Sequence, residues 1–376
     1  MAEVKGSWDG RFDKVVEVLG QNIESRADVG ASVVVMIDGE PMVDAWAGYK
    51  DAAKTAPWES DSIVNVWSTT KTMTFLCALM LVDRGELDFY APVSKYWPEF
   101  AANGKESIEV RHLMSHTAGL SGWDEPLEVE DLADWEKCTS ALAAQAPWWE
   151  PGTASGYHAV SQGFLIGEVV RRITGTTIGA WFKSEIADPL GADFHIGLPE
   201  SEDSRVVPVI PPPIPDLSFL DPTSITRRTF GNPTLDAAAA NNGWWRRAEI
   251  PAANGHGNAR AVATVQSVIA GKGEARGVRL ISDKTCDLIF DEQSNGPDLV
   301  LIVPIRFGMG YGLSGDLMPG GPRTCFWGGY GGSLIVMDQD LRLTVCYTMN
   351  RMDSGLTGDT RGGSIMLAAV ACALGG

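Results

Sequence analysis

The sequence predicts an α+β protein in which one antiparallel sheet is assembled from both ends of the chain. Two observations support this class: a pair of apolar, β-branched segments lies near each terminus, and a helix-like segment accompanies each pair. The stretch between the two pairs is expected to be a mostly helical insertion. We therefore predict a discontinuous α/β sheet domain, formed by residues 1–85 and 301–376, and an inserted, mostly helical domain, residues 86–300.

Three elements are predicted near the N-terminus. Apolar residues recur at helical spacing over residues 12–23. Residues 31–37 are apolar and β-branched, as in a buried strand, and residues 42–47 provide the returning strand. Asp38 and Gly39 lie between these two strands and form a typical hairpin turn.

The C-terminal end repeats this arrangement. Residues 334–337 and 341–349 are predicted strands, and the polar residues 338–340 form the turn between them. The small, apolar residues 364–374 predict a closing helix. Within the insertion, the proline-rich residues 206–215 can form neither a helix nor a central strand, so we expect an extended surface connector there.

Composition and charge exclude several classes of function. The chain has 376 residues with 30 basic and 48 acidic side chains. The resulting net charge of −18 argues against binding to nucleic acid or to anionic membranes. A hydrophobic content of 44% is sufficient for a sizeable core, which excludes disorder as the main state.

Neither a targeting segment nor a cofactor motif is apparent. Residues 1–13 are polar, and no apolar run is long enough to cross a bilayer, so we expect a cytoplasmic protein. The six cysteines include no C-x-x-C pair, which predicts buried free thiols. His112 and His116 have the spacing of helical metal ligands but lack the accompanying glutamate, and residues 310–315 read G-x-G-x-x-G without a following helix. We therefore expect no metal and no cofactor.

Ser68 and Lys71 are the first candidates for catalysis. They open a long apolar helical segment, residues 73–81, which would place the lysine one turn along from the serine on the same face. A serine hydroxyl is a poor nucleophile until a neighbouring base takes its proton, and a buried lysine can be neutral enough to help. Amides at a helix start also face developing negative charge. The rival interpretation of this short motif is a capping serine beside an exposed lysine.

Two further segments give this pair more weight. Tyr157 precedes a helical segment at residues 164–173, and Trp327-Gly328-Gly329 comes just before a predicted strand, where glycines let a ligand approach the backbone closely. In this order, Ser-x-x-Lys, Tyr and Trp-Gly-Gly resemble the three signature elements of the serine β-lactamase and penicillin-binding-protein superfamily. The closest resemblance is to its esterase branch, the family VIII carboxylesterases. The resemblance extends to residues 113–120, 152–153 and 189–191.

The resemblance implies a β-lactamase-like fold and a role for each matched residue. Ser68 would be the acylated nucleophile, and Lys71 and Tyr157 would form the proton-transfer group, with the principal base left open between them. The backbone N–H groups of Ser68 and Tyr330 would form the oxyanion hole. Trp327 would stand where penicillin-recognising members carry the lysine of Lys-Thr-Gly.

Two departures from the penicillin-recognising pattern bear on the substrate. Trp327 replaces the cation that would pair with the carboxylate of a β-lactam or peptide, a charged hydrogen bond worth about 1.5–3 kcal/mol. Ala159 stands where an asparagine would bind an acylamido group. A small, largely apolar ester is therefore the expected substrate and partner. The residues predicted to bind it, in part because the resemblance places the tryptophan pairs at the cleft, are Trp327, Gly328, Gly329, Trp149, Trp245 and His256.

Three rival functions are compatible with the same chain. An acyltransferase would pass the acyl group to an alcohol or amine at the same site, and a β-lactamase or D-amino-acid peptidase would accept amide substrates. A non-enzymatic binding protein is disfavoured because all three catalytic side chains occur in order. The sequence leaves the oligomeric state open.

Overall fold

The structure is a computed structural model of the chain, and it describes residues 2–375. Its strands are β1 (Val4–Trp8), β2 (Gly30–Ile37), β3 (Glu40–Gly48), β4 (Val64–Asn65), β5 (His256–Gly257), β6 (Glu274–Ala275), β7 (Val278–Arg279), β8 (Ser294–Pro297), β9 (Pro304–Phe307), β10 (Gly312–Leu313), β11 (Thr324–Gly328), β12 (Leu334–Asp338) and β13 (Leu343–Met349). Nine of them form one antiparallel sheet in the order β1-β3-β2-β13-β12-β11-β10-β9-β8.

The α-helices are α1 (Asp13–Glu24), α2 (Lys71–Asp83), α3 (Val110–Met114), α4 (Trp135–Ala144), α5 (Ser161–Thr174), α6 (Ile178–Phe182), α7 (Asp188–Leu190), α8 (Ile225–Gly231), α9 (Gly243–Arg247), α10 (Ala259–Ala270), α11 (Asp283–Asp287) and α12 (Thr360–Ala373). Short 3-10 turns are η1 (Gly10–Phe12), η2 (Trp67–Thr70), η3 (Val93–Lys95), η4 (Pro98–Ala101), η5 (Val129–Ala133), η7 (Glu200–Arg205), η8 (Ala237–Asn241) and η9 (Leu288–Phe290), and η6 (Lys183–Ala187) is a π-helical turn.

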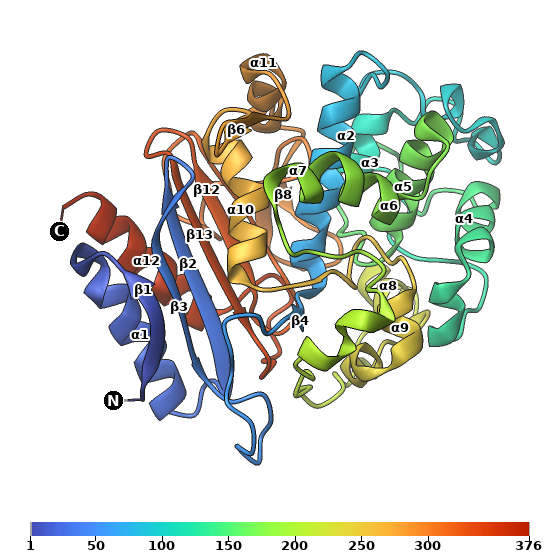
Figure 1. Ribbon diagram of the computed structural model, residues 1–376. Coiled ribbons are helices and arrows are strands. Elements are labelled where there is room, and N and C mark those ends of the chain that lie inside the picture. The colour runs from blue at the N-terminus through green and yellow to red at the C-terminus, as the bar shows by residue number, and fades with distance from the viewer. Residues whose placement is uncertain (1, 376) are drawn as a thin grey trace.

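The two ends of the chain meet inside the sheet, as the sequence predicts. β2 from the N-terminal part pairs along its length with β13 from the C-terminal part (Figure 1). β2 and β3 form the predicted hairpin, and Asp38 and Gly39 at its turn take φ values of 55° and 78°. β12 and β13 are buried along their whole length, which fits their central position and their apolar sequences.

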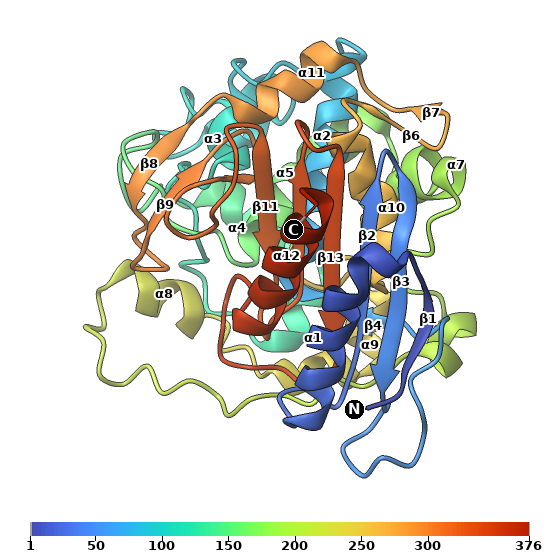
Figure 2. The same ribbon diagram turned by 90° about the vertical axis from the view of Figure 1, so that its left-hand side faces the viewer.

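Helices cover both faces of the sheet. α1 and α12 pack together against one face, and α10 lies on the other face, between the sheet and α2 (Figures 1 and 2). α2 is apolar all round, and its residues from Lys71 to Leu81 are buried, which is typical of a central helix. Helices α3 to α9 form a second region beside the sheet, and the short α11 contacts α2 (Figure 1).

The predicted boundary at residue 300 differs from the observed packing. α10 packs against β2, β12 and β13, and β8 is an edge strand of the sheet, although both belong to the stretch 86–300. The apolar pattern of α10 identifies a helix, but it does not indicate which part of the molecule the helix packs against. The sheet side of the molecule therefore includes chain that precedes residue 301.

The proline-rich connector is extended, but only part of it is exposed. Val207 and Val209 are buried, and the N–H groups of Val207 and Ile210 donate to the carbonyls of Ile63 and Asn350. These bonds tie the connector to the sheet side, so alternate residues pack inward. All six cysteines are buried free thiols, as expected. No helix between residues 2 and 375 combines the length and the apolar character that crossing a bilayer requires.

Candidate active site

The turn that carries Ser68 lies between β4 and α2, and its backbone is unusual. Trp67 takes φ 49°, a left-handed conformation that L residues seldom adopt, and the chain then enters η2 and α2. The Trp67 ring contacts those of Trp245 and Tyr330, with centroid distances of 5.4 and 5.5 Å. Trp245 donates a hydrogen bond from its indole Nε1 to Asn65 Oδ1 (2.9 Å). These aromatic contacts fix the residue directly before Ser68.

Lys71 Nζ lies 3.0 Å from Ser68 Oγ and is completely buried. It also donates to the carbonyl oxygens of Ala159 (2.6 Å) and Ala252 (3.0 Å). Burial disfavours the ammonium form and lowers the pKa of Lys71 well below its ordinary value. A neutral amine has two N–H donors and one lone pair. Because the two carbonyls can only accept, the lone pair is left for the proton of the Ser68 hydroxyl.

Tyr157 meets this pair from a distant part of the chain. Lys71 Nζ lies 4.8 Å from the centroid of the phenol ring, and Tyr157 is almost fully buried. Burial raises the pKa of Tyr157, and the side chains of Ser68 and Trp327 lie close enough to oppose this rise by hydrogen bonding. In this conformation the phenol oxygen has no well-aligned hydrogen-bond partner among the described residues, so it is available to a reacting group.

The edge of β11 comes very close to the nucleophile turn. Trp327 is fully buried in this strand, 5.4 Å from the ring of Tyr157. A Cβ atom on Gly329 would lie 2.3 Å from both the Val66 carbonyl oxygen and Ser333 Oγ, and 3.2 Å from the Ser68 nitrogen. Only glycine allows this approach without displacing the backbone of the turn.

The predicted oxyanion-hole amides, those of Ser68 and Tyr330, belong to two segments that lie against each other at Gly329. The amides on either side of Tyr330 are occupied, since Gly329 donates to Ser333 O and Gly331 donates to Gly355 O. Among the hydrogen bonds of residues 2–375, neither the Ser68 amide nor the Tyr330 amide has a protein acceptor. Paired free N–H groups beside a nucleophile are the usual means of holding the charge of a tetrahedral intermediate.

The predicted binding residues separate into two groups. Trp327 and Gly329 lie at the site, where Trp327 packs on Tyr157 and Gly329 meets the Ser68 turn, whereas Gly328 lies against Thr357 and Gly358. Trp149 is half-buried and packs over Gly156 and the ring of His158, with a centroid distance of 5.9 Å to the latter.

Trp245 and His256 lie differently from Trp327. All three are completely buried, but Trp327 packs on the ring of Tyr157, whereas neither of the other two contacts that ring. Trp245 supports Trp67 from behind, and His256 lies in β5, with its Nδ1 bonded to Asn254 O (2.8 Å). Their types and positions along the chain did not reveal this burial, because it depends on tertiary packing.

Three residues that the sequence did not assign to the site lie directly around Tyr157. His116 is buried with its ring 4.9 Å from that of Tyr157, and burial lowers its pKa well below the ordinary value. His158 is also buried, which lowers its pKa to about 3, so both imidazoles are neutral. The Asp298 carboxylate accepts the Tyr157 N–H (3.0 Å). No local pattern marks Asp298, whereas the spacing of His112 and His116 pointed only to a metal site. Within the described residues, no cluster of His, Cys, Asp or Glu could hold a metal ion.

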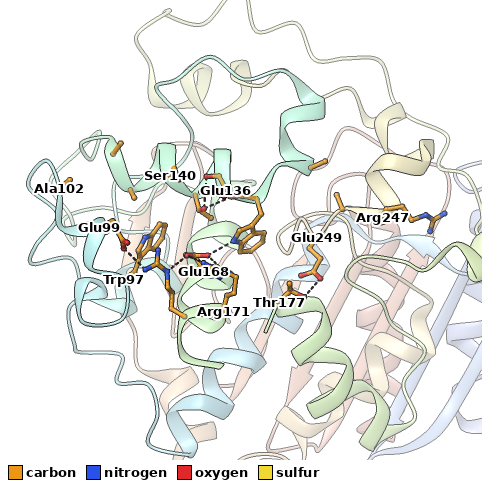
Figure 3. A pocket seen from close by; sticks show the side chains of 17 residues that line it. Trp97, Glu99, Ala102, Glu136, Ser140, Glu168, Arg171, Thr177, Arg247 and Glu249 are labelled. Atoms are coloured by element: carbon orange, nitrogen blue, oxygen red, sulfur yellow. Dashed lines mark hydrogen bonds and ion pairs between the residues drawn. The ribbon is translucent and has the colours of Figure 1, made fainter. Parts of the chain in front are cut away.

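A cavity of about 940 Å³ lies elsewhere, in the helical region (Figure 3). It is lined by residues of η4, α4 and the end of α5, and none of the predicted site residues is among them. Its buried Glu168 accepts hydrogen bonds from Trp135 Nε1 (2.8 Å) and from the guanidinium groups of Arg171 and Arg172. These hydrogen bonds satisfy the Glu168 carboxylate within the protein. The cavity is separate from Ser68 and is not part of the candidate active site.

A family model described as Beta-lactamase matches residues 15–369, and the chain therefore belongs to the beta-lactamase family. The nine-stranded antiparallel sheet with helices on both faces is the α+β, β-lactamase-like fold that the sequence predicted. The fold prediction is thus confirmed.

Within the family, the chain is similar both to proteins named as esterases and to a penicillin-binding protein homolog. The esterase/beta-lactamase LipL of Mycobacterium tuberculosis is 36% identical over 367 residues, which cover 94% of this chain and 84% of that protein. The crystal structure of a family VIII carboxylesterase aligns with a TM-score of 0.93 at 40% identity, over 98% of this chain and 100% of the other. A penicillin-binding protein homolog from Caulobacter crescentus aligns with the same TM-score and coverage at 34% identity. The resemblance stated from the sequence is confirmed.

Proposed function

We propose that this chain is a serine carboxylesterase that hydrolyses small, largely apolar esters through an acyl-enzyme on Ser68. The observation that carries the proposal is the 3.0 Å separation of Lys71 Nζ and Ser68 Oγ, in a site where the other partners of the amine are two carbonyls. Membership of the beta-lactamase family, and relatives named esterase and carboxylesterase, support the reaction class.

Acylation begins when Ser68 Oγ attacks the ester carbonyl carbon and its proton passes to Lys71 Nζ. The carbonyl oxygen becomes an oxyanion, which accepts hydrogen bonds from the Ser68 and Tyr330 amides. The bond to the alcohol oxygen then breaks, and the departing alkoxide takes the proton of the Tyr157 phenol. Lys71 returns a proton to Tyr157, so that a free alcohol and a neutral acyl-enzyme remain.

Deacylation uses the same groups in the opposite direction. A water molecule attacks the acyl carbon while its proton passes to Lys71 through Tyr157. The second tetrahedral intermediate releases Ser68 Oγ, which recovers the proton, and the carboxylic acid departs. The raised pKa of Tyr157 favours a protonated phenol between these steps, consistent with its role as the proton donor to the alkoxide.

The surroundings of the phenol support a preference for apolar esters. Tyr157 and Trp327 belong to one apolar cluster, in which the other members are Val300, Ile305 and Phe307, with Ala159, Ile225, Phe230 and Leu301 packed against it. The rings that pack against Trp327 are those of His116, Tyr157, Phe307 and Phe326, and Lys71, whose Nζ lies over the Tyr157 ring, acts as a neutral base in this proposal. A substrate carboxylate beside Trp327 would therefore lose its hydration without gaining a charged partner. An uncharged ester does not meet this penalty.

Hydrolysis of short-chain p-nitrophenyl esters tests the proposal directly. Wild-type protein should turn over the butyrate ester, and a variant Ser68→Ala should not. Absence of turnover by the wild type with a panel of short esters, or substantial turnover by Ser68→Ala, would refute the assignment. The free carboxylate of a hemisuccinate ester should make it a poorer substrate than the butyrate.

Two alternative activities at the same site are open to measurement. The name of LipL includes beta-lactamase as well as esterase, which favours a test with a chromogenic cephalosporin. Ser68 is only 7% exposed, and a site that admits little water favours acyl transfer. Faster turnover of the cephalosporin than of any ester would favour a β-lactamase. A predominance of transfer product in the presence of an added alcohol would favour an acyltransferase.

A further inference from the structure

Tyr157 lies on backbone that belongs to neither a helix nor a strand. Residues 155–158 are irregular, so neither helical hydrogen bonds nor a strand ladder fix the tyrosine. The proposed mechanism nevertheless requires the phenol to lie beside Ser68, and an error of about 1 Å in such a position can cost about 100-fold in rate. Some other part of the molecule must therefore hold this segment.

His116 holds the segment from one side. Its carbonyl oxygen accepts the Gly156 N–H (2.9 Å), and its ring Nδ1 accepts the His158 N–H (3.0 Å). Because Nδ1 accepts, the neutral ring carries its proton on Nε2, and this nitrogen has no partner among the described residues. His116 itself takes φ 61°, a left-handed conformation that costs energy in a residue with a side chain.

Asp298 holds the segment from the other side. One carboxylate oxygen, Oδ1, accepts three backbone N–H groups, from Tyr157 (3.0 Å), Val300 (2.9 Å) and Leu301 (2.8 Å). The next residue in the chain, Leu299, donates its N–H to Ser155 O (2.9 Å). One side chain thus joins the backbone of Tyr157 to the turn at residues 298–301.

Both groups are held in arrangements that reduce the stability of the folded protein. Asp298 is 1% exposed, and its second oxygen, Oδ2, has no hydrogen-bond partner among residues 2–375. A buried carboxylate with an unpaired oxygen and a histidine with strained backbone both reduce stability. Such features tend to persist where the surrounding structure needs a particular geometry, as at catalytic sites.

We infer that His116 and Asp298 are positioning residues that clamp the backbone of Tyr157 from its two sides and so place the phenol beside Ser68 and Lys71. The inference rests on the proposed function, because it gives that phenol a role. Neither side chain exchanges a proton with the substrate. Each acts through the main chain of residues 156–158.

The test measures kcat/KM for the hydrolysis of ethyl butyrate by the full-length protein, because the ethoxide that departs needs the proton of the Tyr157 phenol. His116→Leu and Asp298→Ala remove the acceptors, and each should hydrolyse this ester about 100-fold more slowly than the wild type. His116→Asn keeps an acceptor near Nδ1 and tolerates positive φ, and Asp298→Asn keeps an oxygen acceptor. Both of these conservative variants should stay within about tenfold of the wild type.

A matched control separates positioning from general loss of stability. Asp338 is also buried and accepts the Leu341 N–H (2.8 Å) and Thr324 Oγ1 (2.5 Å), but at the end of β12. Asp338→Ala should lower the thermal midpoint while leaving kcat/KM of the folded protein for ethyl butyrate unchanged. In a Tyr157→Phe background, Asp298→Ala and His116→Leu should slow hydrolysis no further, because the phenol that they position is already absent.

Each outcome separates the clamp from the proposed function. Hydrolysis of ethyl butyrate by Asp298→Ala and His116→Leu at the wild-type rate would overturn the clamp and leave the acyl-enzyme intact. An equal further loss in the Tyr157→Phe background would also overturn it, since the effect would then not pass through the phenol. Fast hydrolysis of ethyl butyrate by Tyr157→Phe itself would remove the role of Tyr157 and with it the clamp, but not Ser68. A wild type that neither hydrolyses the ester nor is labelled on Ser68 by a fluorophosphonate would overturn both proposals.

Discussion

The serine–lysine side and the tyrosine side of the site are built in different ways. Ser68 and Lys71 lie three residues apart at the junction of η2 and α2, so regular helical structure sets their separation. Tyr157 lies on irregular backbone, and its amide is held by the distant Asp298. The position of Ser68 relative to Lys71 is therefore encoded locally, whereas the position of Tyr157 depends on contacts between distant parts of the chain.

Replacement of Ser68 by alanine is the most severe way to test the helical side. Without the hydroxyl no acyl-enzyme forms, and the rate of p-nitrophenyl butyrate hydrolysis should fall by about 10⁴- to 10⁶-fold. The fold should be unaffected, because the Ser68 hydroxyl contacts other side chains of the site, Lys71 and Tyr157, and no distant part of the core. A stopped assay sensitive to trace turnover provides the measurement, and retention of more than a few per cent of the activity would exclude Ser68 as nucleophile.

Lys71→Ala should reduce kcat by about 10³- to 10⁴-fold, because the hydroxyl loses its proton acceptor. Lys105 provides a matched control: it is also fully buried, and its Nζ donates to the carbonyls of Ala102, Ala143 and Gln145. Lys105→Ala should destabilise the protein without a comparable loss of kcat in the folded fraction. Similar losses of kcat in the two variants would mean that Lys71 acts only through packing.

On the tyrosine side of the site, Tyr157→Phe should reduce kcat by about 10²- to 10³-fold, because the departing alkoxide loses its proton donor. The loss is smaller than for Lys71→Ala, because Lys71 remains to take the serine proton. The loss should be smaller for esters with acidic leaving groups, such as p-nitrophenol, than for ethyl esters, because a good leaving group needs no proton. Values of kcat/KM for the two series check this, because they report acylation and not the deacylation step that Tyr157 also serves. An equal loss of kcat/KM in both series would contradict the role of Tyr157 as proton donor to the alkoxide.

The smallest effect concerns stability and its dependence on pH. Burial lowers the pKa of Lys71, so below pH 10.5 the unfolded chain binds more protons at this residue than the folded protein does. The residue therefore lowers stability below its ordinary pKa, and the penalty shrinks as the pH rises toward 10.5. Lys71→Met should raise the thermal midpoint at pH 7 and lose most of this advantage near pH 10. A gain independent of pH would point to packing alone.

Much of the fold could be predicted because its signals are local. The hairpin at Asp38 and Gly39 and the strands near each terminus follow from turn residues and apolar runs. The role of α10 as a cover for the sheet could not be predicted, since its amphipathic pattern identifies a helix but not its packing partner. The buried Val207 and Val209 of the connector escaped notice for the same reason.

The site shows the same division. The sequence identified Ser68, Lys71 and Tyr157 by order and resemblance, and the structure brings these side chains together. Trp245 was expected to touch substrate but packs behind Trp67, because the sequence does not tell which face of a tryptophan is covered. Asp298 was missed, since an isolated aspartate in a turn carries no local mark of the backbone that it binds.

The most direct test of the central claim is covalent labelling followed by peptide mapping. Wild-type protein would be treated with a fluorophosphonate at neutral pH, and the modified residue identified by mass spectrometry. We expect a single adduct, on Ser68, that is absent from Ser68→Ala and forms much more slowly in Lys71→Ala. An adduct on another residue, or labelling of Lys71→Ala at the wild-type rate, would contradict this claim.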